Sequence, residues 1–228
     1  MINAVIFDVD GVLTDTARLH FRAWSRLFRE ILPSDVAPFG RSDYERLVDG
    51  RSRRDGLRAV LDSRRIPAAS EVVLSGFARR KQDLFLEALA TEPVPGFADA
   101  GPCVARLKAD GILVAAASSS RNARAVLRSC GLIDSFGVIV DGEDMHRLDL
   151  RGKPAPDLFV CAADLLAVEH KHCALVEDSL AGLQAGRRGG LGLLIALDRS
   201  GAGRQDLQQA ADVVALTLDD IDLALLRP

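Results

Sequence analysis

Six short apolar segments recur along the chain, and longer segments with helical periodicity separate most of them. Such runs are typical of buried strands, and they occupy Ile2–Asp8, Ile112–Ser118, Val138–Val140, Cys173–Glu177, Leu191–Ala196 and Val213–Ala215. The helical patterns between them are Phe97–Ala109, Asn122–Cys130, Pro156–Ala167 and Ser179–Arg188. Strands that alternate with helices predict a parallel sheet covered by helices on both faces.

One long stretch breaks this alternation. Between about residues 17 and 90 the sequence shows only helical periodicity, in Leu19–Ile31, Asp43–Val48, Arg54–Asp62 and Glu71–Ala90. We therefore expect an α/β protein. Its Rossmann-like core is formed by residues 1–16 and 92–228, and residues 17–91 form an inserted all-helical cap domain. The two linkers between these parts form a natural hinge.

Composition restricts the function classes. Of the 228 residues 48% are hydrophobic, which supports a substantial core, and the net charge of −3 argues against a nucleic-acid partner. No apolar stretch reaches membrane-spanning length, and Asp8 and Asp10 interrupt the only early apolar run, so we expect no membrane partner and no secretory signal. The four cysteines lack zinc-binding spacing and read as reduced thiols of a cytoplasmic protein, with a monomer as the simplest state.

Polar side chains follow several of the predicted strands. In open α/β sheets ligands bind outside the carboxyl ends of the strands, so these side chains should converge on one edge. They are Asp8 and Asp10 after the first strand, Ser118, Ser119, Ser120, Arg121 and Asn122 after the second, Lys153 in a later loop, and Glu177 and Asp178 after the fourth.

These groups suit phosphoryl transfer. Asp8 and Asp178 offer the oxygen ligands that Mg²⁺ prefers. The run from Ser118 to Asn122 opens a predicted helix, so its hydroxyl and N–H groups can cradle a phosphate. Lys153 adds a compact positive charge. We assign Asp8 as the nucleophile that forms an aspartyl-phosphate and Asp10 as the general acid and base.

With these residues in place, the chain resembles the haloacid dehalogenase superfamily of phosphotransferases over nearly its whole length. FDVDGVLTDT resembles its first motif, SSSRN its second, and GKPAPD with VEDSLAGLQA its third and fourth. The resemblance is closest to the β-phosphoglucomutase branch. HFRAW at residues 20–24 resembles the start of its cap, DGRSRRDG at 49–56 its substrate loop, and ARRKQD at 78–83 a further cap segment.

The resemblance implies more residues than the chemistry alone. It implies that Asp8, the main-chain carbonyl of Asp10 and Asp178 bind the metal with Glu177 beside them. Ser118 and Lys153 then contact the transferring phosphate. It also implies a small phosphosugar substrate, bound by cap and core residues. The expected substrate-binding residues are Thr16, His20, Trp24, Gly50, Arg53, Lys81, Ser119, Ser120, Arg121 and Asn122.

Two features depart from the branch. Arg121 stands where the branch carries lysine, which keeps the charge but alters the geometry, and the loop at residues 51–54 is unusually basic. Both bear on the identity of the sugar.

Each cap residue also has a purely structural interpretation. His20 can simply lie on a helix face, and Lys81 can be a surface lysine. Arg53 can be an exposed charge, and Trp24 can be a core residue.

Several activities remain open at this point. The expected one converts β-glucose-1-phosphate to glucose-6-phosphate through an aspartyl-phosphate and a bisphosphate intermediate. A sugar-phosphate phosphatase is the alternative, because an aspartyl-phosphate can also pass its phosphoryl group to water. A non-catalytic binding protein would lack a nucleophile, a metal ligand or the lysine, and all are present. Dehalogenation needs no Mg²⁺ and gives Asp10 and Asp178 no role.

Overall fold

The protein divides into two compact units. The structure is a computed structural model that describes residues 1–48, 53–67, 70–92, 94–221 and 226. The core unit consists of Met1–Asp15 and Val94–Pro228, and the helical unit is Thr16–Pro93. The cap boundaries expected from the sequence, residues 17 and 91, lie beside these divisions.

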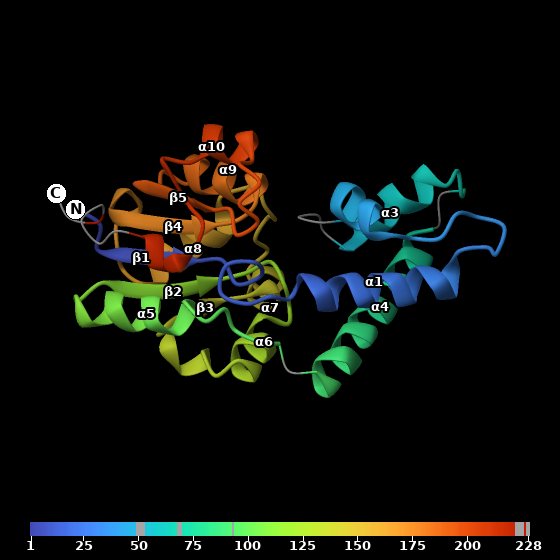
Figure 1. Ribbon diagram of the computed structural model, residues 1–228, viewed down its shortest axis with the longest axis horizontal. Coiled ribbons are helices and arrows are strands. Elements are labelled where there is room, and N and C mark those ends of the chain that lie inside the picture. Colours follow the sequence, from blue (N-terminus) through green and yellow to red (C-terminus); the bar gives the residue numbers. More distant parts are fainter. Residues whose placement is uncertain (49–52, 68–69, 93, 222–225, 227–228) are drawn as a thin grey trace. The chain divides into compact units, whose positions relative to one another are not determined.

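A parallel sheet forms the centre of the core unit. Its strands are β1 (Ala4–Phe7), β2 (Leu113–Ala117), β3 (Val138–Val140), β4 (Cys173–Glu177), β5 (Leu193–Leu197) and β6 (Val213–Ala215). Their order is β3-β2-β1-β4-β5-β6, and every neighbouring pair is parallel (Figure 1). The chain moves outward from β1 to β3 and then returns to the other side of β1 with β4. The central strand therefore borders the switch point where ligands bind in such sheets.

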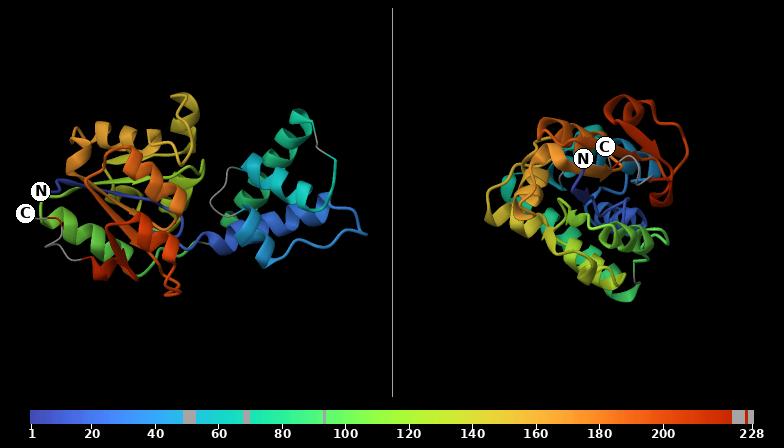
Figure 2. Two further views of the ribbon diagram at one scale, coloured as in Figure 1. Left: turned by 90° about the horizontal axis from the view of Figure 1, so that it is seen from above. Right: turned by 90° about the vertical axis from the view of Figure 1, so that its left-hand side faces the viewer.

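Helices cover both faces of this sheet (Figures 1 and 2). They are α5 (Ala100–Ala109), α6 (Ala123–Ser129), α7 (Gly142–Arg147), α8 (Asp157–Leu165), α9 (Leu180–Arg188) and α10 (Gln205–Ala210), with 3-10 turns at Ile133–Ser135, His170–His172 and Leu218–Asp220. Alternate strand residues such as Ala4 and Ile6 pack with Phe159 and Leu183 in one buried cluster, as the period of two in a strand requires. On β1, Phe7 makes an edge contact with Phe136. The predicted Rossmann-like core is confirmed.

The described part of the helical unit contains helices and no strand. These are α1 (Ala17–Ile31), α2 (Arg41–Asp43), a π-helix at Tyr44–Val48, α3 (Arg53–Ser63) and α4 (Glu71–Thr91). Leu19, Leu27 and Phe28 of α1 are fully buried, as are Leu84 and Phe85 of α4. Among the described helices, none combines the length and the apolarity needed to cross a membrane.

Three short helices were absent from the sequence prediction: α2, α7 and α10. Each has at most six residues, too few for a helical period to be visible. Local capping makes α7 possible, because the Asp141 carboxylate accepts hydrogen bonds from the N–H groups of Glu143 and Asp144. Capping residues are therefore a sequence signal for short helices that a search for apolar periodicity does not detect.

A buried ion pair joins two parts of the helical unit. Arg64 donates two hydrogen bonds to Asp43, at 2.6 and 3.1 Å, and the N–H of Gly40 donates to the same carboxylate at 3.0 Å. Replacing Asp43 with asparagine should lower the free energy of unfolding by about 2 kcal/mol, because charged hydrogen bonds to a buried acceptor are lost. Urea denaturation followed by the fluorescence of Trp24, the single tryptophan, measures this change.

The pH dependence of this difference has a definite sign. The hydrogen bond from Arg64 holds the pKa of Asp43 below its ordinary value of 3.8. The stabilisation is thus complete above that value and is lost as the pH falls through the lower folded-state pKa. Glu45→Gln serves as the control, since Glu45 pairs with Arg41 in solvent and should contribute less than about 0.5 kcal/mol. Equal destabilisation by both variants would contradict the prediction.

Candidate active site

Asp8 lies directly after β1, at the centre of the carboxyl edge of the sheet. Its N–H donates to the carbonyl of Val176 in the neighbouring β4 at 3.0 Å, which fixes the main chain at this point. Lys153 reaches this edge from the loop after α7, and the Lys153–Pro154 peptide is cis. The Nζ of Lys153 donates to Asp8 Oδ1 and to Glu177 Oε1, each at 2.5 Å. Three segments far apart in the sequence therefore meet here, as predicted from the strand ends.

Burial sets the charge states of this cluster. Burial of the carboxylate raises the pKa of Asp8 to about 7; Lys153 opposes the rise, and Glu177 and Asp10 add to it. Burial likewise raises the pKa of Asp178 well above its ordinary value, reinforced by Glu177 and Asp8. Burial disfavours the Lys153 cation, but the charges of Asp8 and Glu177 outweigh it and raise its pKa. Three carboxyl groups thus share one lysine, and burial favours the neutral forms of Asp8 and Asp178 while Lys153 keeps Glu177 ionised.

Glu177 is fully buried and its two oxygens already accept several hydrogen bonds. Burial alone would raise its pKa, but the charge and hydrogen bond of Lys153 lower it. Oε2 accepts from the N–H groups of Asp178 and Ser179, at 2.5 and 2.8 Å, and the Ser179 hydroxyl donates to Oε1 at 2.9 Å. A Cβ at Gly182 would lie 1.6 Å from Oε1. Ser179 and Gly182 thus shape this site, although the helical pattern predicts Ser179 only as the start of a helix.

The three acidic groups suit a hard divalent cation. Asp8, Glu177 and Asp178 each offer one oxygen, and these atoms all lie within 4.8 Å of one another, the oxygen-only donor set that Mg²⁺ prefers. Because hydrogen bonds occupy both oxygens of Glu177, Asp8 and Asp178 are the better direct ligands. Gly11 makes room for this arrangement. Its φ is +86°, and a Cβ there would lie 2.0 Å from Asp178 Oδ2, so a side chain at this position would collide with the carboxylate.

A second polar group lies after β2. The buried hydroxyl of Ser118 donates to Asp10 Oδ2 at 3.0 Å and accepts from the N–H of Ser120 at 3.0 Å. The Ser120 hydroxyl accepts from the N–H of Asn122 at 3.2 Å. Ser119 and Arg121 are exposed, and Arg121 lies 3.6 Å from Glu143. The predicted serine run therefore forms one turn, and its first member contacts the second carboxylate of the first motif.

In the helical unit, three predicted substrate residues form one cluster. The Nζ of Lys81 lies 2.7 Å from His20 Nδ1, 5.4 Å from the ring centre of Trp24 and 5.0 Å from that of Phe85. His20 stacks on Phe85 with ring centres 4.4 Å apart. Lys81 is 1% exposed and Trp24 4%. The surface-lysine alternative is therefore wrong for Lys81, because apolar and aromatic side chains enclose its stem.

The remaining predicted residues of this unit are less informative. Thr16 is buried and its carbonyl accepts from the N–H of His20 at 2.9 Å at the start of α1. Arg53 is half-buried at the first position of α3. Gly50 lies outside the described residues.

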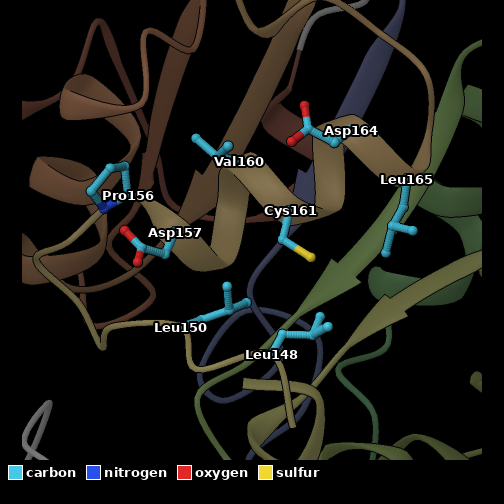
Figure 3. Close-up of a pocket in the computed structure, with 8 residues that line it drawn as sticks. All are labelled: Leu148, Leu150, Pro156, Asp157, Val160, Cys161, Asp164 and Leu165. Atoms are coloured by element: carbon cyan, nitrogen blue, oxygen red, sulfur yellow. The ribbon is translucent and has the colours of Figure 1, made fainter. Parts of the chain in front are cut away.

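A separate hollow of about 520 Å³ lies against α8 (Figure 3). Leu148, Leu150, Cys161 and Leu165 form most of its apolar lining, and Asp157 and Asp164 are its acidic lining residues. None of the eight residues that line it is a predicted site residue. The acidic cluster, and not this hollow, is therefore the candidate active site.

Known proteins are similar to this chain in sequence and in fold. Residues 2–190 match the haloacid dehalogenase-like hydrolase family. A β-phosphoglucomutase from Mycobacterium bovis is 36% identical over 96% of this chain and 91% of its own. A phosphorylated carbohydrates phosphatase from Thermotoga maritima is 30% identical over 83% of this chain and 82% of its own. The solved β-phosphoglucomutase from Clostridium difficile superposes with a TM-score of 0.81 at 25% identity, covering 100% of this chain and 96% of that one. The match over most of the sequence, together with the carboxylates and lysine that converge at the sheet edge, makes the chain an enzyme of the haloacid dehalogenase-like hydrolase family.

Proposed function

We propose that the protein is a Mg²⁺-dependent phosphosugar mutase that converts β-glucose-1-phosphate to glucose-6-phosphate through an aspartyl-phosphate and a sugar bisphosphate. The observation that carries this proposal is the placement of Lys153 between Asp8 and Glu177, next to Asp178, at the carboxyl edge of the sheet. The similarity to β-phosphoglucomutases over nearly the whole chain supports the choice of substrate.

In the first half-reaction the phosphorylated enzyme acts on the sugar phosphate. Asp10 accepts the proton of the sugar 6-hydroxyl while that oxygen attacks the phosphorus on Asp8. The new bond joins phosphorus to the sugar oxygen, the bond to Asp8 breaks, and the bisphosphate forms. A bound Mg²⁺, held by Asp8, the Asp10 carbonyl and Asp178, would offset charge on the phosphate oxygens.

The second half-reaction begins after the bisphosphate has turned around in the site. Asp8 attacks the phosphorus on the 1-oxygen, and Asp10 returns its proton to that oxygen as the bond breaks. The product is glucose-6-phosphate, and the enzyme is phosphorylated again. Lys153 and Ser118 contact the transferring phosphate, while Ser119, Ser120, Arg121 and Asn122 hold the sugar or its other phosphate. Glu177 orients Lys153, because its own oxygens accept bonds from Lys153 and three other groups.

The helical unit supplies sugar recognition in this proposal. Arg53 contacts the phosphate that is not being transferred, and His20 with Lys81 and Trp24 contacts the sugar. The pairing of Lys81 with His20 supports a joint role for these two side chains. Thr16 lies at the linker where we expect the unit to close when substrate binds, which excludes water and favours transfer to sugar. Gly50 stays a predicted substrate-binding residue.

A coupled assay with glucose-6-phosphate dehydrogenase tests the proposal. With β-glucose-1-phosphate, Mg²⁺ and a trace of glucose 1,6-bisphosphate, we expect NADPH to form without matching release of inorganic phosphate. Activity should disappear on chelation and return with Mg²⁺. Steady phosphate release with no isomerised product would instead favour a phosphatase, the activity named for the similar Thermotoga maritima protein.

A further inference from the structure

An arginine distant from the four motifs holds the turn that carries Asp10. Arg199 follows β5, and its Nε donates to the carbonyl of Gly11 at 3.2 Å while its Nη2 donates to the carbonyl of Val12 at 2.7 Å. These two carbonyls come directly after Asp10 in the chain. The guanidinium thus holds two successive peptide groups of the turn that begins at the candidate acid and base.

Two neighbours fix the guanidinium itself. Asp99, at the start of α5, accepts from Nη1 at 2.9 Å and from Nη2 at 3.0 Å. The same carboxylate accepts from the N–H of Leu218 at 2.8 Å. On its face the guanidinium carbon lies 3.7 Å from the ring centre of Phe97. A planar fork bound by a carboxylate and stacked on a ring has little rotational freedom.

The rest of the turn is held by main-chain and threonine hydrogen bonds. The N–H groups of Leu13 and Thr14 both donate to the carbonyl of Val9 at 3.0 Å, and the N–H of Gly11 donates to the carbonyl of Thr14 at 2.9 Å. These bonds close the turn on itself. Other segments hold it as well: the N–H of Phe97 donates to the carbonyl of Leu13 at 3.0 Å, and Arg199, which stacks on Phe97, joins the turn to the loop after β5. Arg199 thus helps to fix how the turn is oriented against the sheet.

We propose that Arg199, oriented by Asp99, is a positioning residue for the proton transfers of Asp10. The inference rests on the proposed function, in which Asp10 gives a proton to the leaving sugar oxygen. Ser118 holds the Asp10 carboxylate from one side, and Arg199 holds the main chain that bears it. Without these bonds the peptide groups after Gly11 can shift and let the Asp10 carboxylate move away from the leaving oxygen, while Asp8 and the Asp10 carbonyl, which precede the held peptide groups, keep their places.

A comparison of two leaving groups distinguishes the positioning of Asp10 from a general loss of active-site structure. A sugar alkoxide needs a proton as it leaves, whereas acetate from acetyl phosphate does not. In Arg199→Met, kcat for a sugar phosphate should fall by roughly 10- to 100-fold, the loss expected when a catalytic group is misplaced. The KM of this variant should stay within about twofold of the wild-type value, because binding is retained. The rate of Asp8 phosphorylation by acetyl phosphate should stay within about threefold of the wild-type rate, because nucleophilic attack is retained. Arg199→Lys should recover part of the loss.

Arg106→Met is the matched control. Arg106 also donates to two main-chain carbonyls of the core unit, those of Leu218 and Ile221, at 3.4 and 3.3 Å. Leu218 also contacts Asp99, so the control disturbs the same neighbourhood without touching the turn. We compare the rate on a sugar phosphate with the rate on acetyl phosphate. In Arg106→Met the ratio of these two rates should equal that of the wild type, whereas in the Arg199 variants it should fall.

Hydrogen exchange keeps the inference testable if the wild type acts on no sugar phosphate. Amides at residues 11–14 should exchange faster in Arg199→Met than in the wild type or in Arg106→Met. Suppose that the wild type is inactive on sugar phosphates, that the amides at residues 11–14 are protected in the wild type, and that Arg199→Met loses this protection. That result would overturn the proposed function and leave the hold of Arg199 on the turn intact. Unchanged exchange at these amides, or equal losses on both phosphoryl donors, would overturn the role of Arg199.

Discussion

Asp8→Asn should have no measurable phosphoryl transfer to sugar or to water. An amide keeps the shape of the side chain but cannot attack phosphorus, and removal of a catalytic nucleophile costs on the order of 10⁴-fold or more in rate. The substitution also removes one of the two carboxylates that Lys153 contacts. Two measurements check the result: the primed isomerase assay, and mass spectrometry of the peptide containing residue 8 after treatment with acetyl phosphate.

The control for this variant is Asp134→Asn, which makes the same chemical change at an exposed position. It should retain wild-type turnover and phosphorylation. If Asp8→Asn turned over substrate like the wild type, or if phosphate appeared on another residue, a covalent mechanism at Asp8 would be excluded. The fold assignment would survive either result, because it rests on the sheet and the family match.

Lys153→Met should lose both activity and stability. The substitution keeps the length of the side chain and its contact with the Phe159 ring but removes the cation from two buried carboxylates. Breaking a buried ion pair on one side costs about 3–5 kcal/mol, and the rate should fall by at least roughly 10²-fold because a charge opposite the transferring phosphate is lost. Urea denaturation and the coupled assay measure the two effects.

The pH dependence of the stability loss identifies its cause. Lys153 lowers the pKa of Glu177 from its ordinary value of 4.5, so the part of the stabilisation that comes from Glu177 is complete above that value and is lost as the pH falls through the lower folded-state pKa. The difference between Lys153→Met and the wild type should therefore shrink in acid. Lys108→Met is the control, since Lys108 lies at an exposed position, where its Nζ donates to the carbonyl of Ser135 at 3.0 Å. A loss that is constant with pH would rule out the electrostatic explanation.

Much of the core could be predicted because its strands are buried on both faces. A strand such as Cys173–Glu177 has no polar residue before its end, so both its limits and the position of Glu177 follow from the sequence. Parallel strands present their carboxyl ends at one edge, which is why Asp8, Lys153 and Asp178 could be expected to meet. The structure brings these groups together, and their catalytic roles stay predictions.

Contacts between distant loops could not be predicted in the same way. Arg199 and Asp99 are 100 positions apart, and nothing in the periodicity of either segment pairs them. The burial of Lys81 likewise depends on how α1 and α4 pack, since a lysine in a helical pattern is ordinarily exposed. Short helices such as α7 depend on capping, a local signal that a search for apolar periodicity passes over.

The core unit holds the two ends of the helical insertion together. Thr14 pairs with Gly96, and the N–H of Asp15 donates a hydrogen bond to the carbonyl of Pro95. The two points where the polypeptide leaves and rejoins the sheet-containing unit are neighbours. A segment whose own ends lie equally close can therefore replace the insertion without moving the strands. In the proposed function, exchanging the insertion between homologues should change substrate preference and leave the groups at the strand ends in place.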